Sequence, residues 1–325
     1  MSSPSTATPD LVPPSLPATA ADLGPAAAQE PLVSVVIATR NRARLLPAGI
    51  ESVLKGCEGV PVEVIYVNDS STDDTSAVLA RFAAEGRIRH LDAENCRAPG
   101  RARNVGAGIA RGRWLLFTDD DCIIPEHWAR DLLALQAKHG CEALSGGFLP
   151  VNMETGAERY YEYRMRTIFG RKAKPISAAP MMCFLVDRAK FLQIGGFSPL
   201  RLSSQEDWEL CYRLTRAGCR LIYDPSVSVG HEYARHWGYV FSRVTDTAWI
   251  APLVWRESGV NVAGKLAKDT ARFLASPVWC LRYFPLDLYP QAVGLEALYY
   301  VIRLASVVSS TVTGGKVFRR YRAAA

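Results

Sequence analysis

Lysine and arginine are absent from the first thirty residues, which are instead rich in proline, alanine, serine and threonine. A secretory signal peptide needs a basic start followed by an apolar stretch, so this composition excludes one for that segment. A segment with few bulky apolar side chains cannot build a core, and we expect a disordered tail over residues 1–30. Long apolar runs are also missing, because the nearest approach to a membrane span, residues 295–312, is interrupted by Glu296 and Arg303.

None of the eight cysteines forms a C-x-x-C pair, and most lie inside apolar runs. A zinc site is therefore disfavoured, and we expect free, mostly buried thiols in a reducing compartment, which predicts a cytoplasmic protein. The net charge of +6 is modest, and the lysines and arginines are scattered except near the C-terminus. Nucleic acid is consequently not an expected partner.

What the chain does contain is a regular alternation of strand-like and helix-like segments. Continuous β-branched runs such as VSVVIA (33–38) are typical of strands buried on both faces of a sheet. The pattern predicts strands at 33–38, 62–67, 87–92 and 113–118 and helices at 42–56, 71–86, 100–112 and 125–139. Strands that alternate with helices form parallel sheets, so we predict an α/β fold with a mostly parallel, Rossmann-like sheet and helices on both faces.

Polar clusters follow three of these strands. Residues 39–41 follow the first strand, residues 68–71 the second, and Asp119, Asp120 and Asp121 the fourth. The carboxyl ends of parallel strands meet in one crevice, where ligands bind. Successive residues of an extended chain point to opposite sides, so Asp119 and Asp121 can face one ligand while Asp120 turns away. Two such carboxylates suit Mg²⁺ or Mn²⁺ bound together with phosphate, and a solvated acidic turn is the alternative.

Five segments resemble, in order, the motifs of family-2 glycosyltransferases, which have the GT-A fold. They are VSVVIATRNR (33–42), VEVIYVNDSSTDDT (62–75), GRARNVGAGIARGRWLLFTDDD (100–121), IGGFSPLRLSSQEDWELCYRLTRAGCRLIYDP (194–225) and VGHEY (229–233). The resemblance implies a GT-A domain over residues 31–235 that transfers a sugar from a nucleotide-sugar donor, expected to be UDP-linked, to an acceptor hydroxyl with inversion. It also implies that the D-x-D motif binds Mg²⁺ or Mn²⁺ together with the diphosphate of the donor.

The resemblance also divides the site into parts, residue by residue. It assigns the nucleotide sugar to Ala38, Arg40, Asn41, Asp69, Arg103, Asn104, Asp119 and Asp120, with the Asp69 carboxylate accepting the imide N–H of uracil. It assigns the metal to Asp121 as the more direct ligand, Asp119 and His231, although an ordinary core histidine is the alternative for His231. On the acceptor side, Gly147 and Gly196 are expected to let the backbone approach the donor sugar and the acceptor, with ordinary turns as the alternative. Trp208 is either a wall for a sugar ring or a core residue, and Glu206 would cap the helix or position the loop. The resemblance assigns the general base to Asp207.

From residue 236 to residue 325 the chain leaves the resemblance. This part is aromatic-rich and is predicted to form a helical extension broken at Pro277, Pro285 and Pro290. Its last segment, GGKVFRRYRAAA (314–325), is basic and aromatic. Apolar helices followed by such a tail suit the anionic inner face of a cell membrane, which would make the protein peripheral to that membrane. A helical cap on the catalytic domain is the alternative.

Two other classes of function share parts of this pattern. A non-catalytic scaffold that binds a nucleotide sugar or a polyprenyl phosphate would not need Asp207 beside the D-x-D motif. A nucleotidyltransferase would be expected to carry a glycine-rich phosphate loop, whereas ATRNRAR (38–44) contains no glycine. No Q-x-x-R-W motif is present, so addition of a single sugar is favoured over polymerisation. The acceptor stays open among a glycan, a lipid-linked acceptor and a small molecule.

Overall fold

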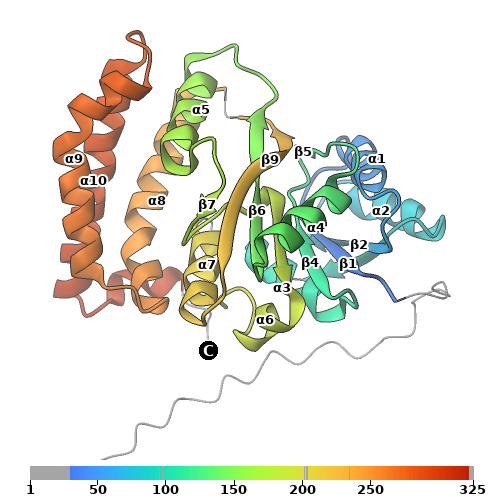
Figure 1. Ribbon diagram of the computed structural model, residues 1–325. Helices are drawn as coiled ribbons and strands as arrows, with labels where there is room; N and C mark the ends of the chain where they lie inside the picture. Colours follow the sequence, from blue (N-terminus) through green and yellow to red (C-terminus); the bar gives the residue numbers. More distant parts are fainter. Residues whose placement is uncertain are drawn as a thin grey trace, which may run out of the picture.

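The computed structural model describes residues 30–94, 96, 98–200, 202, 204–233 and 235–321 of the chain. The disordered tail predicted for residues 1–30 lies outside these residues except for Glu30. A central β-sheet is covered by helices, and the C-terminal helices stand side by side at one end of the molecule (Figure 1). All eight cysteines are free and buried, as predicted.

The first half of the sheet follows the predicted order of elements. Strands β1 (Val33–Thr39), β2 (Val62–Asp69), β3 (Arg89–Ala93) and β4 (Trp114–Phe117) are parallel and lie in the spatial order β3-β2-β1-β4. Helices α1 (Leu46–Gly56), α2 (Thr75–Ala84), α3 (Pro99–Ile109) and α4 (Trp128–His139) accompany them. Helix α1 begins later than predicted, with Pro47 in its first turn, where a missing N–H costs no helical hydrogen bond.

The second half of the sheet is mixed, which the strand–helix alternation did not predict. Strand β8 (Phe184–Asp187) runs antiparallel to β4 and to β6 (Ala143–Pro150), while β9 (Leu221–His231) runs parallel to β6. The short strands β5 (Cys122–Ile123) and β7 (Lys174–Pro175) pair antiparallel with β9. The regular alternation stops after β6, because α5 (Gly156–Phe169) is followed by β7 and the short helix η2 (Met181–Cys183) before β8 begins.

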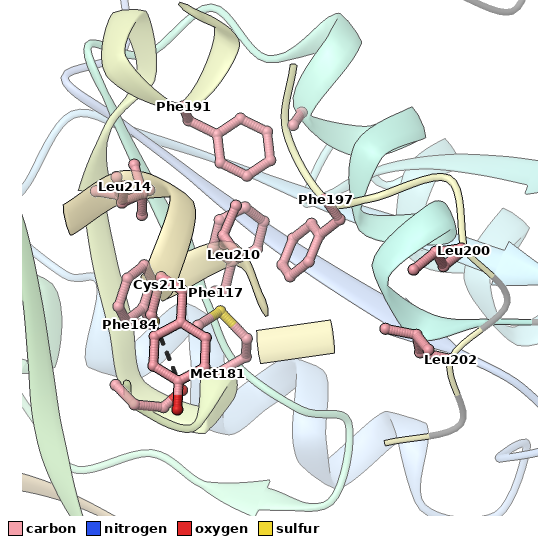
Figure 2. Packing of buried hydrophobic residues seen from close by; sticks show 14 of the residues in the cluster. Phe117, Met181, Phe184, Phe191, Phe197, Leu200, Leu202, Leu210, Cys211 and Leu214 are labelled. Carbon is pink, nitrogen blue, oxygen red and sulfur yellow. Dashed lines mark hydrogen bonds between the residues drawn. The ribbon is translucent and has the colours of Figure 1, made fainter. Parts of the chain in front are cut away.

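Each face of the sheet carries its own core. Val35 of β1 belongs to the core formed with α1, α2 and α4, whereas its neighbour Val36 belongs to the core formed with α3. On the α3 side, Phe117 packs against Phe191 of α6 (Arg188–Gln193) and against Phe197, with ring centroids 5.5 Å apart in both pairs. Figure 2 shows these three rings close to Leu210 of α7 (Glu206–Arg216). This packing fixes the ends of β4 and α7, which carry the site.

The C-terminal extension is helical, as predicted. It consists of α8 (Trp237–Glu257), α9 (Val262–Tyr283), α10 (Tyr289–Val312) and the short helix η3 (Lys316–Tyr321). Pro285 lies between α9 and α10 and Pro290 in the first turn of α10, but the predicted break at Pro277 is wrong, because Pro277 lies inside α9. A proline removes one helical hydrogen bond, and here the packing of α9 along α10 offsets that loss.

The extension and the part of the chain that precedes it share one core. Trp255 of α8 and Phe318 of η3 are each 1% exposed and belong to the same buried cluster as Phe117 of β4. The division at residues 235 and 236 stays a prediction, although α8 begins close to it. Among the described residues, α10 is the one helix long and apolar enough to cross a membrane, a property that buried core helices share.

Candidate active site

The loops that follow β1 and β2 are tied together. The N–H of Asn41 donates to Ser71 Oγ at 2.8 Å, and the N–H of Thr72 donates to Asn41 Oδ1 at 2.7 Å. Asn41 and Ser70 have φ angles of 54° and 53°, a left-handed conformation that is uncommon outside glycine and collects at functional sites. The protein itself therefore fixes the two loops that are predicted to hold the nucleotide.

The other predicted nucleotide residues occupy the same edge of the sheet. Asp69 is the buried last residue of β2, Ala38 is half-buried in β1, and Arg40 is exposed just after β1 ends. Strands β1 and β2 are paired in register as far as Thr39 and Asn68, so these side chains come from adjacent strand ends. Their contacts with a nucleotide stay predictions.

Arg103 of α3 is buried and bridges two acidic residues. Its Nη2 lies 2.5 Å from Asp119 Oδ1, and its Nη1 lies 3.2 Å from Glu206 Oε1. Burial alone would lower the pKa of this guanidinium, but Asp119 and Glu206 outweigh burial and raise that pKa. One buried cation thus connects the D-x-D motif at the end of β4 with the start of α7.

The other two aspartates of the motif also face basic side chains. Asp120 Oδ2 accepts a hydrogen bond from Thr39 at 2.6 Å, and Arg42 Nε lies 3.4 Å from Asp120 Oδ1. Arg42 Nη2 lies 3.5 Å from Asp121 Oδ2, and His231 Nε2 lies 3.7 Å from Asp121 Oδ1. Each aspartate therefore has a basic neighbour in the protein, which explains how three like charges are accommodated. Arg42 is a site residue that the sequence analysis missed, although it closes the first motif.

Burial still disfavours ionised carboxylates at this place. It raises the pKa of Asp120 to about 6. Burial also raises the pKa of Asp121, and the negative charge of Asp119 raises it further. The basic side chains of the protein therefore do not fully compensate the negative charge of these carboxylates, and an additional cation beside Asp121 would be favourable.

The donor atoms around Asp121 fit a hard divalent cation. Carboxylate oxygens of Asp119 and Asp121 and the thiol of Cys122 lie within 4.8 Å of one another. Within the described part of the chain, Asp121 Oδ1 and His231 Nδ1 are buried without a hydrogen-bond partner. Burial raises the pKa of the Cys122 thiol well above its usual value, so this thiol stays protonated and the oxygens are the better ligands.

Asp207 lies in the first turn of α7, and its Oδ1 accepts from the N–H of Trp208 at 2.8 Å. Burial, and then the neighbouring Glu206, raise the pKa of Asp207 well above its usual range. The cations Arg103 and Arg243 act in the opposite direction without cancelling that rise. A carboxyl group with a raised pKa at a cavity wall is suited to accept a proton from a substrate.

Three predicted residues have packing roles that the sequence did not show. Asn104 donates to the carbonyl oxygen of Phe197 and accepts from its N–H, both at 2.8 Å. A Cβ on Gly196, whose φ is 67°, would lie 2.5 Å from Asn104 Oδ1, and one on Gly147 would lie 2.3 Å from Ser228 Oγ of β9. Close packing therefore explains these residue types, and their contacts with a substrate stay predictions.

One cavity of ≈ 380 Å³ brings together the predicted metal ligands and the predicted general base. The predicted residues that line it are Arg103, Asp119, Asp121, Glu206, Asp207, Trp208 and His231. Those outside its lining are Ala38, Arg40, Asn41, Asp69, Asn104, Asp120, Gly147 and Gly196. Helices α5, α8 and α10 supply a further wall, which the sequence analysis missed because these helices lie outside the quoted motifs.

The family of the chain follows from sequence comparison together with this architecture. A model described as glycosyl transferase family 2 matches residues 34–195, which include β1 to β4 and the D-x-D motif. The solved structure of a mannosyltransferase from Pyrobaculum calidifontis, in complex with GDP-Man and Mn²⁺, superposes with a TM-score of 0.57 at 18% identity. The match covers 88% of this chain and 90% of that one, and at this identity it shows the fold alone. The chain belongs to glycosyltransferase family 2 and has the GT-A fold.

Two relatives illustrate how far the likeness in sequence extends. The succinoglycan biosynthesis protein ExoO of Rhizobium meliloti is 42% identical over 107 residues, which are 33% of this chain and 30% of that protein. The pre-mycofactocin glycosyltransferase of Mycobacterium tuberculosis is 26% identical over 309 residues, which cover 90% of this chain and 58% of that protein. The chain thus spans less than two thirds of the length of either relative.

Proposed function

We propose that the protein transfers a sugar from a nucleotide-sugar donor to an acceptor hydroxyl, with inversion at the anomeric carbon and with Mg²⁺ or Mn²⁺ as cofactor. The observation that carries this proposal is that the carboxylates of Asp119 and Asp121 line the same cavity as the half-buried carboxyl group of Asp207. A diphosphate-binding centre and a proton acceptor are the two parts that such a displacement needs.

The donor is expected to lie along the strand ends. Its nucleotide would rest on the tied loops of Arg40 and Asn41, with the Asp69 carboxylate accepting the imide N–H of a uracil base. UDP is therefore the nucleotide that we propose, while the similar mannosyltransferase, in complex with GDP-Man, makes GDP the comparison to test. The diphosphate would lie at the D-x-D motif, where Arg103 and Arg42 add positive charge.

The metal would be held by Asp121, with His231 and Asp119 beside it. Asp121 is the better first ligand because its Oδ1 has no hydrogen-bond partner among the described residues, whereas Asp119 Oδ1 is paired with Arg103. When bound, the cation supplies positive charge for the departing diphosphate. Asp207 takes the proton of the acceptor hydroxyl as the oxygen bonds to the anomeric carbon. The bond to the diphosphate breaks, and that leaving group keeps the electron pair.

We also propose that the protein is cytoplasmic and contacts an anionic membrane through its C-terminal helices. Helices α9 and α10 expose the apolar side chains Leu274, Val278, Leu281, Val301, Leu304, Val308 and Val312. The exposed cations Lys268, Arg282, Lys316 and Arg319 lie on or just after the same helices. The exposed acid Asp287 is paired with Arg159 at 2.8 Å, so the net charge of this surface is positive.

A screen of UDP- and GDP-linked sugars, each with and without Mn²⁺ or Mg²⁺, tests the proposed activity. We expect one donor to raise the melting temperature and to be hydrolysed slowly, and only when metal is present. Asp121→Asn should abolish both effects and leave the fold intact. Full activity of the wild type in excess chelator would contradict the metal assignment. Donor binding without hydrolysis or transfer would favour the non-catalytic scaffold.

A further inference from the structure

The cavity does not end at Asp207. Its lining also includes Tyr161 of α5, Tyr239 of α8 and Tyr299 of α10. An in-line displacement requires the acceptor on the side of the sugar away from the diphosphate, which is the side of the general base. The space past Asp207 is therefore the part of the cavity that a donor bound at the D-x-D motif leaves for a second substrate.

The walls of this space are aromatic. Tyr160 is 2% exposed and stacks on Phe284 at a centroid distance of 5.4 Å, so its ring is held in place within the wall. Tyr161 packs against Tyr233 at 5.2 Å and is half-buried, and Tyr239 is 55% exposed. Aromatic faces that line a cavity and keep part of their surface open suit the apolar face of a pyranose ring.

Polar groups alternate with these rings. Arg164 of α5 reaches Glu296 of α10 at 2.6 Å and lies over the ring of Tyr299, 5.6 Å from its centroid. Arg243 of α8 lines the same cavity as Glu206 and Asp207, and although burial alone would lower the pKa of its guanidinium, the negative charges of these two acids contribute to raising that pKa. A purely apolar chain would only remove water from such charged groups, which is unfavourable, whereas a ring with several hydroxyls can add hydrogen bonds to them.

Acidic residues outnumber arginines in the lining, with Asp119, Asp121, Glu206, Asp207 and Glu296 against Arg103, Arg164 and Arg243. Arg103 faces Asp119 and Glu206, and Arg164 faces Glu296. An acceptor that carried its own carboxylate or phosphate would add a charge to a space whose cations already face carboxylates. The electrostatics therefore favour a neutral ligand over an anionic one.

The start of α7 is fixed to this wall. Gln205, whose φ is 65°, donates from Nε2 to the carbonyl oxygen of Thr247 in α8 at 2.7 Å. The helix that carries the aromatic side chain of Tyr239 is thus hydrogen-bonded to the residue that precedes Glu206 and Asp207. The position of the aromatic wall and the position of the general base are set together.

We propose that the space enclosed by α5, α8 and α10 is an acceptor subsite for a neutral pyranose. This inference rests on the proposed function and names the substrate class of the same site. Tyr161, Tyr239 and Tyr299 contact the ring, and Trp208 lies between this subsite and the donor.

Saturation-transfer NMR with methyl glucopyranoside, galactopyranoside and mannopyranoside tests the subsite, in the presence and absence of UDP and Mg²⁺. We expect ring protons of at least one pyranoside to receive saturation, and methyl glucuronide and octyl phosphate to bind more weakly. Tyr239→Ala should raise the dissociation constant of that pyranoside about 10-fold, which is typical of the loss of one aromatic contact. Tyr283→Ala is the matched control, because Tyr283 is 47% exposed on α9 and lies outside the cavity lining. The dissociation constant of the pyranoside for this variant should stay within twofold of the wild-type value.

The proposal is overturned if no methyl pyranoside binds, if Tyr239→Ala binds as tightly as the wild type, or if the glucuronide or octyl phosphate binds best. The affinity for UDP, measured on the same samples, checks that each variant is folded. A protein that binds pyranosides but no nucleotide sugar would contradict the proposed function and not this subsite. A protein that is stabilised by a nucleotide sugar but binds no pyranoside would contradict the subsite alone.

Discussion

Arg103 shows at the scale of single residues how this site is organised. The side chain at this position must be cationic and must reach two carboxylates at once. The guanidinium of Arg103 lies 2.5 Å from Asp119 and 3.2 Å from Glu206. Since Arg103 is buried, its removal would leave both acids with an uncompensated charge, which is strongly unfavourable. The same cation limits the repulsion between Glu206 and the adjacent Asp207.

Asp207→Asn is expected to lower kcat by roughly 10²–10⁴-fold, the usual range for loss of a general base. The asparagine keeps the shape of the side chain and removes its basicity, so the dissociation constant of the donor should change little. Steady-state kinetics with a soluble acceptor, together with donor titration, measure both quantities. If Asp207→Asn kept a normal kcat while Glu206→Gln lost it, the general base would be Glu206. Normal kcat in both variants would contradict the mechanism.

The pH profile of the wild type gives a second check on the same residue. Burial and Glu206 raise the pKa of Asp207, so the basic form becomes available only as the pH rises through that raised value. We expect kcat/KM to increase with pH well above the ordinary range of a carboxyl group, and this rising limb to be absent from the residual activity of Asp207→Asn. A profile that is flat from pH 5 to pH 9 in the wild type would contradict Asp207 as the base.

Among the elements, α9 and α10 expose several large apolar side chains. The exposed positions Leu274, Val278 and Leu281 of α9 are four and three residues apart, so they lie on one side of that helix. Part of the basic segment 314–325 is packed in the structure, because Phe318 of η3 is 1% exposed and belongs to the core. Deleting it would therefore disturb the fold, and substitution of its charges is the sharper test.

The double variant Lys316→Gln/Arg319→Gln is expected to bind liposomes that contain phosphatidylserine about 30-fold more weakly than the wild type at low salt. Each cation near an anionic surface contributes about 1 kcal/mol, and two such contributions correspond to this factor. Vesicle sedimentation measures the change. Arg130→Gln/Lys138→Gln on α4 is the matched control, because both side chains are exposed on a helix far from α9 (Figure 1). Equal binding by the test variant and the control, or no vesicle binding by the wild type, would favour a helical cap.

At the scale of the whole molecule, the extension and the catalytic part are expected to unfold together, because they share a core. Trp255→Ala in α8 should lower the free energy of unfolding by about 3–5 kcal/mol, the usual cost of removing a buried tryptophan. Urea denaturation followed by circular dichroism measures this change. Leu286→Ala is the control in the same extension, since Leu286 is 79% exposed and its loss should change stability by about 0.5 kcal/mol or less. Two separate transitions in the wild type would contradict a shared core.

Local pattern was enough to predict the first half of the fold. β1, β2 and β4 are found within two residues of their predicted bounds, because buried parallel strands need continuous apolar runs that few other structures use. The convergence of Asp119, Asp121 and Asp207 on one cavity also agrees with the sequence, since strand ends and helix starts have fixed places in this fold. The direction of β8 and the continuity of α9 through Pro277 could not be predicted, because both depend on packing with distant elements.

The amino-acid sequence by itself determined the family, the order of the first elements and the residue types at the strand ends. Only the tertiary structure decided which charges meet. Arg103, for example, joins Asp119 to Glu206, which lies 103 positions after Arg103 in the chain. The tertiary structure also decided that α5, α8 and α10 enclose the space beyond Asp207. The physical reason is that hydrophobic periodicity is local, whereas ion pairs and cavity walls arise where segments distant in the chain are packed together.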